Sequence, residues 1–227
     1  MNVVEKEFNA LAAEYEENRL SAWYQAHAEE MLQHCTALQH GDILDVGCGT
    51  GYFLREYVKR NPGVRAVGID TSAEMISTAR EKAAAEGLEN IGFIHADWEK
   101  LDPRIFEGYR FRLIFCANAF HYFEQAQTAS NKLFNQLSEG GRLYVLERNK
   151  SRSLLTLLWG FLHTVFIRDQ VVFYKTSDPI HLFNNAGFVH VKALRSIKKY
   201  FWKNKTFTSI VLIQASRPET RNGSAET

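Results

Sequence analysis

The sequence predicts an α/β fold, a Rossmann-like, doubly wound sheet of seven strands that is mostly parallel and ends in an antiparallel hairpin. Short apolar runs alternate with helical patterns over residues 43–147, as in parallel sheets that carry helices on both faces. A glycine-rich turn at residues 47–51 joins the first apolar run to the first helical pattern, which is typical of doubly wound sheets. Two β-rich runs follow each other near the end of the chain, and consecutive strands with a short connection pair antiparallel.

Each element has its own local signal. The strand candidates are short, apolar and β-rich, and they occupy residues 43–46, 64–69, 91–95, 113–116, 143–147, 188–194 and 207–213. Helices are expected at residues 52–60, 73–85, 125–137 and 179–185. The second helix opens with Thr71-Ser72-Ala73-Glu74, which has the spacing of a capping box, and it stops at Gly87.

The chain has 227 residues, a length that suits one domain with a full core. We expect this domain to cover residues 1–215, with an N-terminal helical cap at 1–40 and a lid-like insert at 148–176. Residues 216–227 contain no large apolar side chain, so they are expected to form a disordered tail.

Charge and composition limit the classes of partner and the cellular location that we expect. The net charge of +1 argues against a nucleic-acid partner. Residues 1–144 carry 14 Lys and Arg against 21 Asp and Glu, whereas residues 145–227 carry 13 against 5. The apolar stretch at 154–167 is shorter than the about 20 residues that cross a bilayer, and no export signal opens the chain. We therefore expect a cytoplasmic protein without a transmembrane segment, as a monomer or a homodimer.

The glycine loop at residues 47–51 is the main candidate for a ligand-binding site. Gly47, Gly49 and Gly51 lie between an apolar strand and a helix, where a chain without Cβ atoms can turn sharply and approach a ligand. The helix start adds unpaired N–H donors. Asp70 ends the second strand, nineteen residues after Gly51, and an acidic residue there can accept hydrogen bonds from both hydroxyls of a ribose.

Three details favour S-adenosylmethionine (SAM) over a dinucleotide. Tyr52 follows the third glycine, where a dinucleotide fingerprint requires glycine or alanine. Asp45 precedes the first glycine by two residues; its carboxylate suits the ammonium group of a methionine moiety and would repel a pyrophosphate. The antiparallel hairpin expected at the end of the sheet fits a methyltransferase.

These residues carry a family resemblance. Ile43-Leu44-Asp45-Val46-Gly47-Cys48-Gly49-Thr50-Gly51 resembles the first motif of class I SAM-dependent methyltransferases, and especially of the small-molecule group that includes enzymes of ubiquinone and menaquinone biosynthesis. The resemblance covers roughly residues 5–147 and 176–214. Further similar motifs follow in order: Gly68–Ile76, His95–Trp98, Asn118–Phe123, Leu137–Leu143 and Ala186–Phe188, with Phe8, Asn9, Ala12 and Tyr15 of a cap helix before them.

The resemblance implies a cofactor site for SAM, with S-adenosyl-L-homocysteine as the product. Asp45 and the loop backbone would hold the methionine part, Asp70 the ribose, and Asp97 the adenine amino group. Met75 would pack on the adenine ring, Asn118 would face the methionine end, and Tyr15 would close the site from the cap. The complete predicted set is Tyr15, Asp45, Gly47, Cys48, Gly49, Gly51, Asp70, Thr71, Met75, Asp97, Trp98 and Asn118.

Two residues are candidates for catalysis. His121 could remove a proton from an oxygen or nitrogen acceptor, because a histidine titrates near neutral pH; the alternative is a packed histidine of the core. Tyr15 is the second candidate. The histidines show no ligand spacing and no pair of carboxylates suggests a magnesium site, so no metal is expected.

The acceptor stays open between several interpretations. We expect a small, apolar or aromatic substrate methylated by direct displacement, at oxygen, nitrogen or carbon. The apolar insert at 151–175 could form a substrate wall, pack on the core or a second copy, or touch a lipid surface. The basic run near Lys203 would suit a charged sheet edge, an anionic substrate or RNA. An RNA methyltransferase, a non-catalytic SAM-binding regulatory or partner protein, and a nicotinamide-dependent oxidoreductase remain the alternatives.

Overall fold

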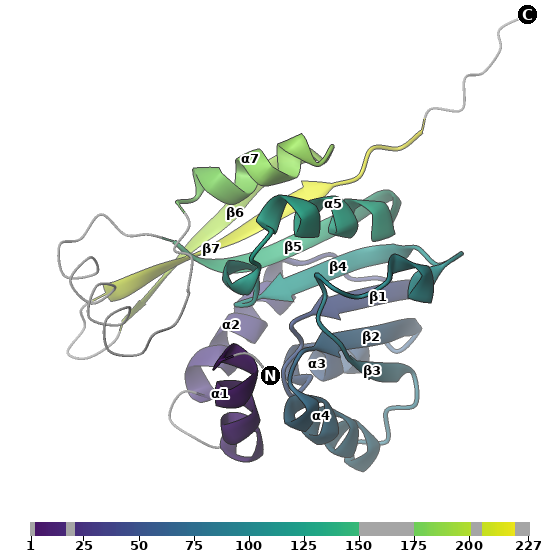
Figure 1. Ribbon diagram of the computed structural model, residues 1–227, viewed down its shortest axis with the longest axis vertical. Coiled ribbons are helices and arrows are strands. Elements are labelled where there is room, and N and C mark those ends of the chain that lie inside the picture. The colour runs from purple at the N-terminus through teal and green to yellow at the C-terminus, as the bar shows by residue number, and fades with distance from the viewer. Residues whose placement is uncertain (1–2, 17–20, 150–174, 201–205, 221–227) are drawn as a thin grey trace, which may run out of the picture.

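The computed structural model describes residues 3–16, 21–149, 175–200 and 206–220 (Figure 1). One seven-stranded sheet runs through it in the order β3-β2-β1-β4-β5-β7-β6. Strands β1 to β5 pair in parallel, and β7 is antiparallel to both of its neighbours. This confirms the predicted fold class. The strands are β1 (Gly41–Val46), β2 (Val64–Asp70), β3 (Ile91–His95), β4 (Phe111–Ala117), β5 (Leu137–Asn149), β6 (Val189–Tyr200) and β7 (Thr206–Ser216).

The helices follow the local signals of the sequence. The helices predicted at 52–60 and 73–85 are found with those bounds, and the Ser72 hydroxyl accepts a hydrogen bond of 3.1 Å from the Met75 N–H at the start of the second one. The described helices are α1 (Val3–Leu11), η1 (Ala12–Glu14), α2 (Ser21–His34), α3 (Tyr52–Arg60), α4 (Ala73–Ala85), η2 (Pro103–Phe106), η3 (Phe120–Tyr122), α5 (Ala126–Gln136) and α7 (Ser177–Asn185).

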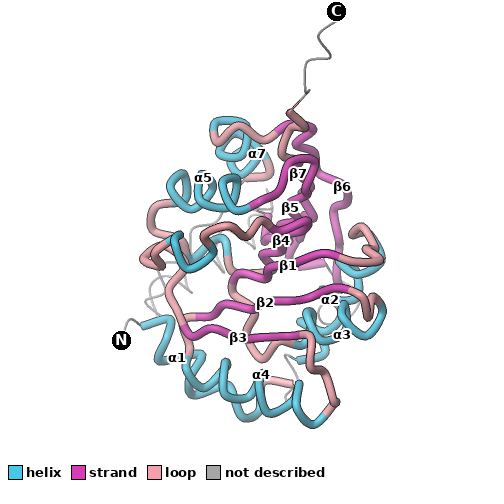
Figure 2. Tube along the Cα trace, turned by 90° about the vertical axis from the view of Figure 1, so that its right-hand side faces the viewer, coloured by secondary structure: helices cyan, strands magenta, loops and turns pink. Residues whose placement is uncertain are grey.

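The sheet is covered on both faces, which explains the nearly continuous apolar character of its central strands. Along β1, Ile43 packs with side chains of α2, α3 and α4, whereas its neighbour Leu44 packs with side chains of α5 and α7. Figure 2 shows α2 and α3 on one side of the sheet, and α5 and α7 on the other. The alternation follows from the two-residue period of a strand.

The strand order places a crevice at the end of β1. This strand lies between β2 and β4, so the connections that leave the carboxyl ends of β1 and β4 run in opposite directions. Ligands of doubly wound sheets bind at such a switch point. The glycine loop follows β1, Asn118 follows β4, and Asp70 is the last residue of β2.

One expectation about the end of the chain needs correction. The tail does not become disordered at Ser216, because that residue closes β7 and the chain is described to Thr220. Arg217 replaces the missing apolar contacts: its guanidinium donates to the backbone carbonyl of Leu137 at 2.7 Å and lies over the ring of Phe134. The predicted insert at 148–176 lies outside the described residues between positions 150 and 174, and so do Lys203 and Lys205 of the basic run that begins at Lys198.

Candidate functional site

The glycine loop after β1 is shaped by hydrogen bonds to the end of β2. The N–H groups of Gly47 and Cys48 both donate to the carbonyl oxygen of Ile69, at 2.8 and 3.0 Å. Gly47 has φ +77°, and a Cβ built on it would lie 2.3 Å from Cβ of Ala119. Gly49 has φ +53°, and a Cβ there would meet no atom within 4 Å. The first glycine is therefore required by packing, and the second faces open space.

Asp70 joins this loop to the start of α4. Its Oδ2 accepts a hydrogen bond of 2.8 Å from the Gly49 N–H, and its Oδ1 accepts one of 2.9 Å from the Ser72 N–H. Burial raises the pKa of Asp70, and these backbone donors act in the opposite direction. A carboxylate has about four acceptor positions, so the carboxylate keeps acceptor capacity for a ligand.

A cleft with two lobes opens beside the loop. The large lobe has a volume of about 230 Å³ and the small lobe about 80 Å³. The two lobes adjoin each other, because six residues border both of them: Tyr15, Tyr24, Gly47, Gly49, Ala117 and Asn118. Asp70 borders the large lobe, and Asp45 borders the small one.

The small lobe contains a carboxyl group without a counter-charge among the described residues. Asp45 is 2% exposed, and its Oδ1 has no hydrogen-bond partner there. Burial, and after it the charge of Asp70, raises the pKa of Asp45 to about 8. Asn118 shares this wall with a left-handed φ of 54°, and its buried Oδ1 also lacks a described partner. Two unsatisfied acceptors in one lobe suit a ligand that carries N–H donors and a positive charge.

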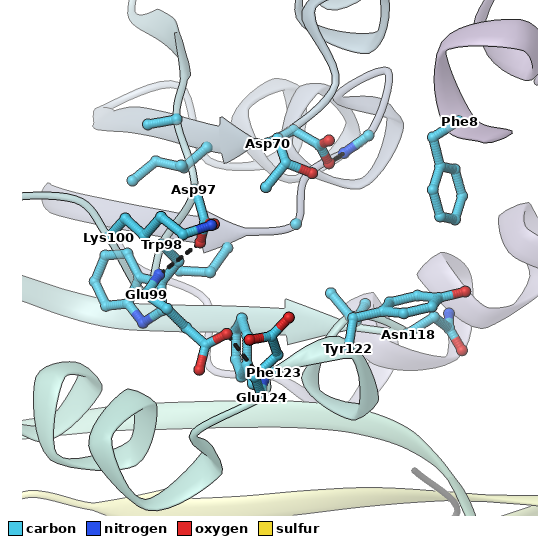
Figure 3. Close-up of a pocket in the computed structure, with 18 of the residues that line it drawn as sticks. Phe8, Asp70, Asp97, Trp98, Glu99, Lys100, Asn118, Tyr122, Phe123 and Glu124 are labelled. Carbon is cyan, nitrogen blue, oxygen red and sulfur yellow. Dashed lines mark hydrogen bonds and ion pairs between the residues drawn. The ribbon is translucent and has the colours of Figure 1, made fainter. Parts of the chain in front are cut away.

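The large lobe ends in a braced loop that carries Asp97 and Trp98 (Figure 3). The Lys132 ammonium donates to the carbonyl oxygens of Trp98, Glu99 and Leu101 at 2.7 to 2.9 Å. Asp97 accepts from the Glu99 N–H at 3.0 Å and pairs with the exposed Lys100 ammonium at 2.6 Å. Three backbone carbonyls held by one cation keep this end of the lobe in place.

Aromatic rings of the N-terminal cap line the opposite end. We define the cap as α1, η1, the turn Tyr15–Glu16 and α2. The ring of Phe8 makes edge contacts with Tyr15 and Tyr122, at centroid distances of 6.4 and 5.9 Å, and Tyr15 stacks on Tyr24 at 4.9 Å. Phe8 and Tyr122 lie together in Figure 3, away from Asp97. This end of the cleft offers flat apolar contacts.

The two catalytic candidates have different surroundings. Burial, and after it Tyr24, raises the pKa of Tyr15 far above its ordinary value, so its hydroxyl keeps the proton and can donate a hydrogen bond. His121 is 4% exposed and is absent from the described walls of both lobes. The Glu147 carboxylate contacts its Nδ1 at 2.6 Å and accepts from its backbone N–H at 3.1 Å.

Ten of the twelve residues predicted for the cofactor line the cleft. The two that do not are Met75, a fully buried residue of α4, and Gly51, which packs against the ring of Phe93. The ten are Tyr15, Asp45, Gly47, Cys48, Gly49, Asp70, Thr71, Asp97, Trp98 and Asn118.

Sequence reasoning missed three charged residues that hold parts of the site in place. Glu147 is 1% exposed and ends the apolar run of the predicted strand at 143–147. A charged residue in an otherwise apolar strand could have indicated a buried carboxylate with a specific partner. Glu16 directly follows the predicted Tyr15 but has no signal of its own. Lys132 lies within a predicted helix, where nothing local distinguishes it from a solvated lysine.

Two features are absent from the part of the chain that the structure describes. Within 3–16, 21–149, 175–200 and 206–220, no three His, Cys, Asp or Glu side chains gather into a site for a metal ion. No helix among those residues is long and apolar enough to span a membrane.

Comparison with known proteins identifies a family that matches this chain. A family model described as a methyltransferase domain matches residues 38–158. A demethylmenaquinone methyltransferase of Thermus thermophilus is 38% identical over 105 residues, which are 46% of this chain and 46% of that protein. Malonyl-[acyl-carrier protein] O-methyltransferase 1 of Ilyobacter polytropus is 30% identical over 140 residues, 62% of this chain and 50% of that protein.

The fold has a solved counterpart. Magnesium protoporphyrin IX methyltransferase from Synechocystis, crystallised with bound S-adenosyl-L-homocysteine, superposes with a TM-score of 0.72 at 17% identity, over 95% of this chain and 98% of that one. At this identity the likeness concerns the fold alone. The chain spans about half the length of the curated relatives it matches.

Proposed function

Because the chain belongs to the methyltransferase domain family, we propose that it transfers the methyl group of SAM to a small apolar or aromatic molecule by direct displacement. One observation carries this proposal: the cleft places the unpartnered carboxyl of Asp45 at one lobe and the hydrogen-bonded carboxylate of Asp70 at the other. A ligand that fits both has a cation at one end and hydroxyl donors near its centre. SAM has this layout.

The residues of the cleft suit the parts of SAM in turn. Asp45 and Asn118 would accept hydrogen bonds from the ammonium group in the small lobe. Asp70 would accept from the ribose hydroxyls, since its bonds to Gly49 and Ser72 hold it at the right edge of the loop. Asp97 and Trp98 would contact the adenine at the braced end of the large lobe. Burial of Asp45 without a described partner supports this fit most directly, because an ammonium would supply the missing positive charge.

The protein would contribute mainly position and exclusion of water. SAM supplies a methyl group activated by its sulfonium: when the bond from sulfur to the methyl carbon breaks, the electron pair stays on sulfur and the leaving group is S-adenosyl-L-homocysteine. An acceptor held in line with that methyl reacts as if at high effective concentration, which is worth several kcal/mol. The rings of Phe8, Tyr15, Tyr24 and Tyr122 would hold a flat acceptor and keep water out.

A base is needed only where the acceptor atom starts protonated. His121 borders neither lobe, so it could serve as the base only if its ring turned toward the cleft; the Glu147 carboxylate, 2.6 Å from its Nδ1, would hold the ring. Tyr15 is better suited to donate a hydrogen bond, since burial keeps its hydroxyl protonated.

Transfer of a labelled methyl group tests the proposal. The full chain is incubated with SAM carrying a tritiated methyl group and with cell extract, and the extract is then separated into RNA, protein and small molecules. We expect label in the small-molecule fraction that partitions into organic solvent. Label confined to RNA or protein would contradict the substrate class, and no label in any fraction would indicate a regulatory protein without turnover.

A further inference from the structure

The carboxylate of Glu16 connects the cap to three parts of the core. Its Oε1 accepts a hydrogen bond of 2.6 Å from the Thr50 hydroxyl and one of 2.8 Å from Nη2 of Arg55. Its Oε2 accepts from Arg55 at 3.0 Å and from Nζ of Lys82 at 3.2 Å. Thr50 belongs to the glycine loop, Arg55 to α3 and Lys82 to α4. One side chain thus joins the cap to the loop and to both helices that flank it.

This contact is sheltered from solvent, unlike an ordinary surface ion pair. The side chains of Arg55 and Glu16 are 3% and 14% exposed. Sheltered pairs resist dissociation because a lone charge left in such a place is costly. Arg55 has a second partner in Glu86, at 2.5 Å. The guanidinium would therefore keep one carboxylate if Glu16 were neutralised, and the chain should still fold.

The Glu16 contact lies at the wall of the small lobe. Tyr15, Glu16 and Thr50 all border that lobe, together with Asp45. Tyr15 borders the large lobe as well. The position of the Tyr15 ring is therefore coupled to the carboxylate of the next residue, which is bonded to Thr50 of the glycine loop.

We propose that Glu16 is a positioning residue: through Thr50, Arg55 and Lys82 it holds the cap on the glycine loop, so that Tyr15 closes the cleft over bound SAM. The inference rests on the proposed function. Without the carboxylate, α1 keeps its hydrogen bond between the Ser72 hydroxyl and Asn9, at 2.5 Å, but Tyr15 loses its anchor to the loop. A ligand bound beneath Tyr15 then escapes faster.

Glu16→Gln in the full chain tests this role. We expect the dissociation constants of SAM and S-adenosyl-L-homocysteine, measured by calorimetry, to rise about tenfold, as for the loss of one hydrogen bond to a charged group. Most of the change should appear as faster dissociation, measured by stopped-flow fluorescence of the tryptophans. Thr50→Val removes only the hydroxyl contact and leaves the ion pairs, so it should give a smaller effect of the same sign.

Glu29→Gln is the matched control. Glu29 also links the cap to α3, by a pair with Arg60 at 2.7 Å, but both side chains are about half exposed and neither borders the cleft. We expect wild-type affinity and dissociation rate for this variant. In the double variant Glu16→Gln with Thr50→Val, the two effects on affinity should combine to less than their product, because they break one shared contact.

The outcomes separate this inference from the proposed function. Wild-type protein that does not bind SAM would overturn both. Wild-type binding together with an unchanged affinity and dissociation rate in Glu16→Gln would overturn only the role of Glu16. A lower melting temperature in Glu16→Gln with unchanged binding would also overturn it, since Glu16 would then serve stability alone.

Discussion

The Asp70 carboxylate accepts a hydrogen bond of 2.8 Å from the backbone N–H of Gly49, across the turn between β1 and α3. The bond links the acidic end of β2 to the loop that opens on the cleft. Asp70 therefore has two tasks, since it holds the loop and presents its remaining acceptor positions to the ligand.

Asp70→Ala should weaken SAM binding by about 1–3 kcal/mol, because it removes both the acceptor for the ribose hydroxyls and the support of the loop. Calorimetric titration of SAM measures the change. Asp42→Asn is the control, since Asp42 pairs with the exposed Arg65 and neither residue borders the cleft. Equal affinities for wild type and Asp70→Ala would remove Asp70 from the site.

Binding of SAM should release close to one proton at pH 7. The pKa of Asp45 is about 8 in the ligand-free protein, so this carboxyl is mostly protonated at pH 7. An ammonium group beside it favours the ionised form and drives the proton off. Titrations at pH 7 in phosphate and in Tris, whose ionisation enthalpies differ, measure the released proton. Equal binding enthalpies in the two buffers would contradict this role of Asp45.

Asp45→Asn should stabilise the ligand-free protein at pH 8 while it weakens SAM binding at least tenfold. The folded pKa is raised from 3.8 to about 8. The stability associated with the protonated carboxyl is thus full below about pH 4 and is lost as the pH rises through 8. Asparagine does not titrate, so the melting temperature of wild type should fall relative to that of Asp45→Asn between pH 5 and 8. Parallel melting profiles across that range would argue against a buried, unpaired Asp45.

Alanine at the first two glycines of the loop should lower stability to different extents. Both positions have a left-handed φ, which costs an alanine roughly 1–2 kcal/mol. Gly47→Ala adds a collision with Ala119 and should lower the free energy of unfolding by more than that. Gly49→Ala has room for its methyl group, so it should remain folded but bind SAM more weakly. Urea unfolding and calorimetry separate the two, and equal stability losses would contradict the packing described for Gly47.

Glu147→Ala should lower the free energy of unfolding by about 3 kcal/mol or more, because it leaves the N–H and ring nitrogen of His121 without their acceptor. Glu147→Gln keeps one carbonyl acceptor and should cost less. Urea unfolding of both variants checks the order.

If His121 also acts as a base, His121→Phe should lower kcat about a hundredfold or more at unchanged SAM affinity. An unchanged kcat would leave His121 a structural residue.

Local patterns were sufficient to predict the sheet and most of the cleft. The bounds of α3 and α4 follow from the Gly51 turn and the Ser72 cap, which are features of neighbouring residues. The strand ends place Asp45, Asp70 and Asn118 at one edge because parallel strands share their direction. Each of these inferences needs only sequence order and the geometry of a doubly wound sheet.

Contacts between distant segments could not be predicted in this way. Glu16 meets Arg55 and Lys82 at separations of 39 and 66 residues, and the pairing depends on how the cap packs. Met75 is the converse case: its helix position was predicted, but the side chain faces the core and lines neither lobe. β5 continues past its predicted end at Glu147 to Asn149, because Arg148 and Asn149 pair with Ile210 and Ser209 of the distant β7.

Calorimetric titration of the full wild-type chain with SAM, S-adenosyl-L-homocysteine and NAD tests the central claim most directly. We expect SAM and S-adenosyl-L-homocysteine each to bind at one site per chain, with release of a proton at pH 7, and NAD to give no binding heat. Binding of NAD without binding of SAM would contradict the proposed function and indicate a nicotinamide-dependent enzyme.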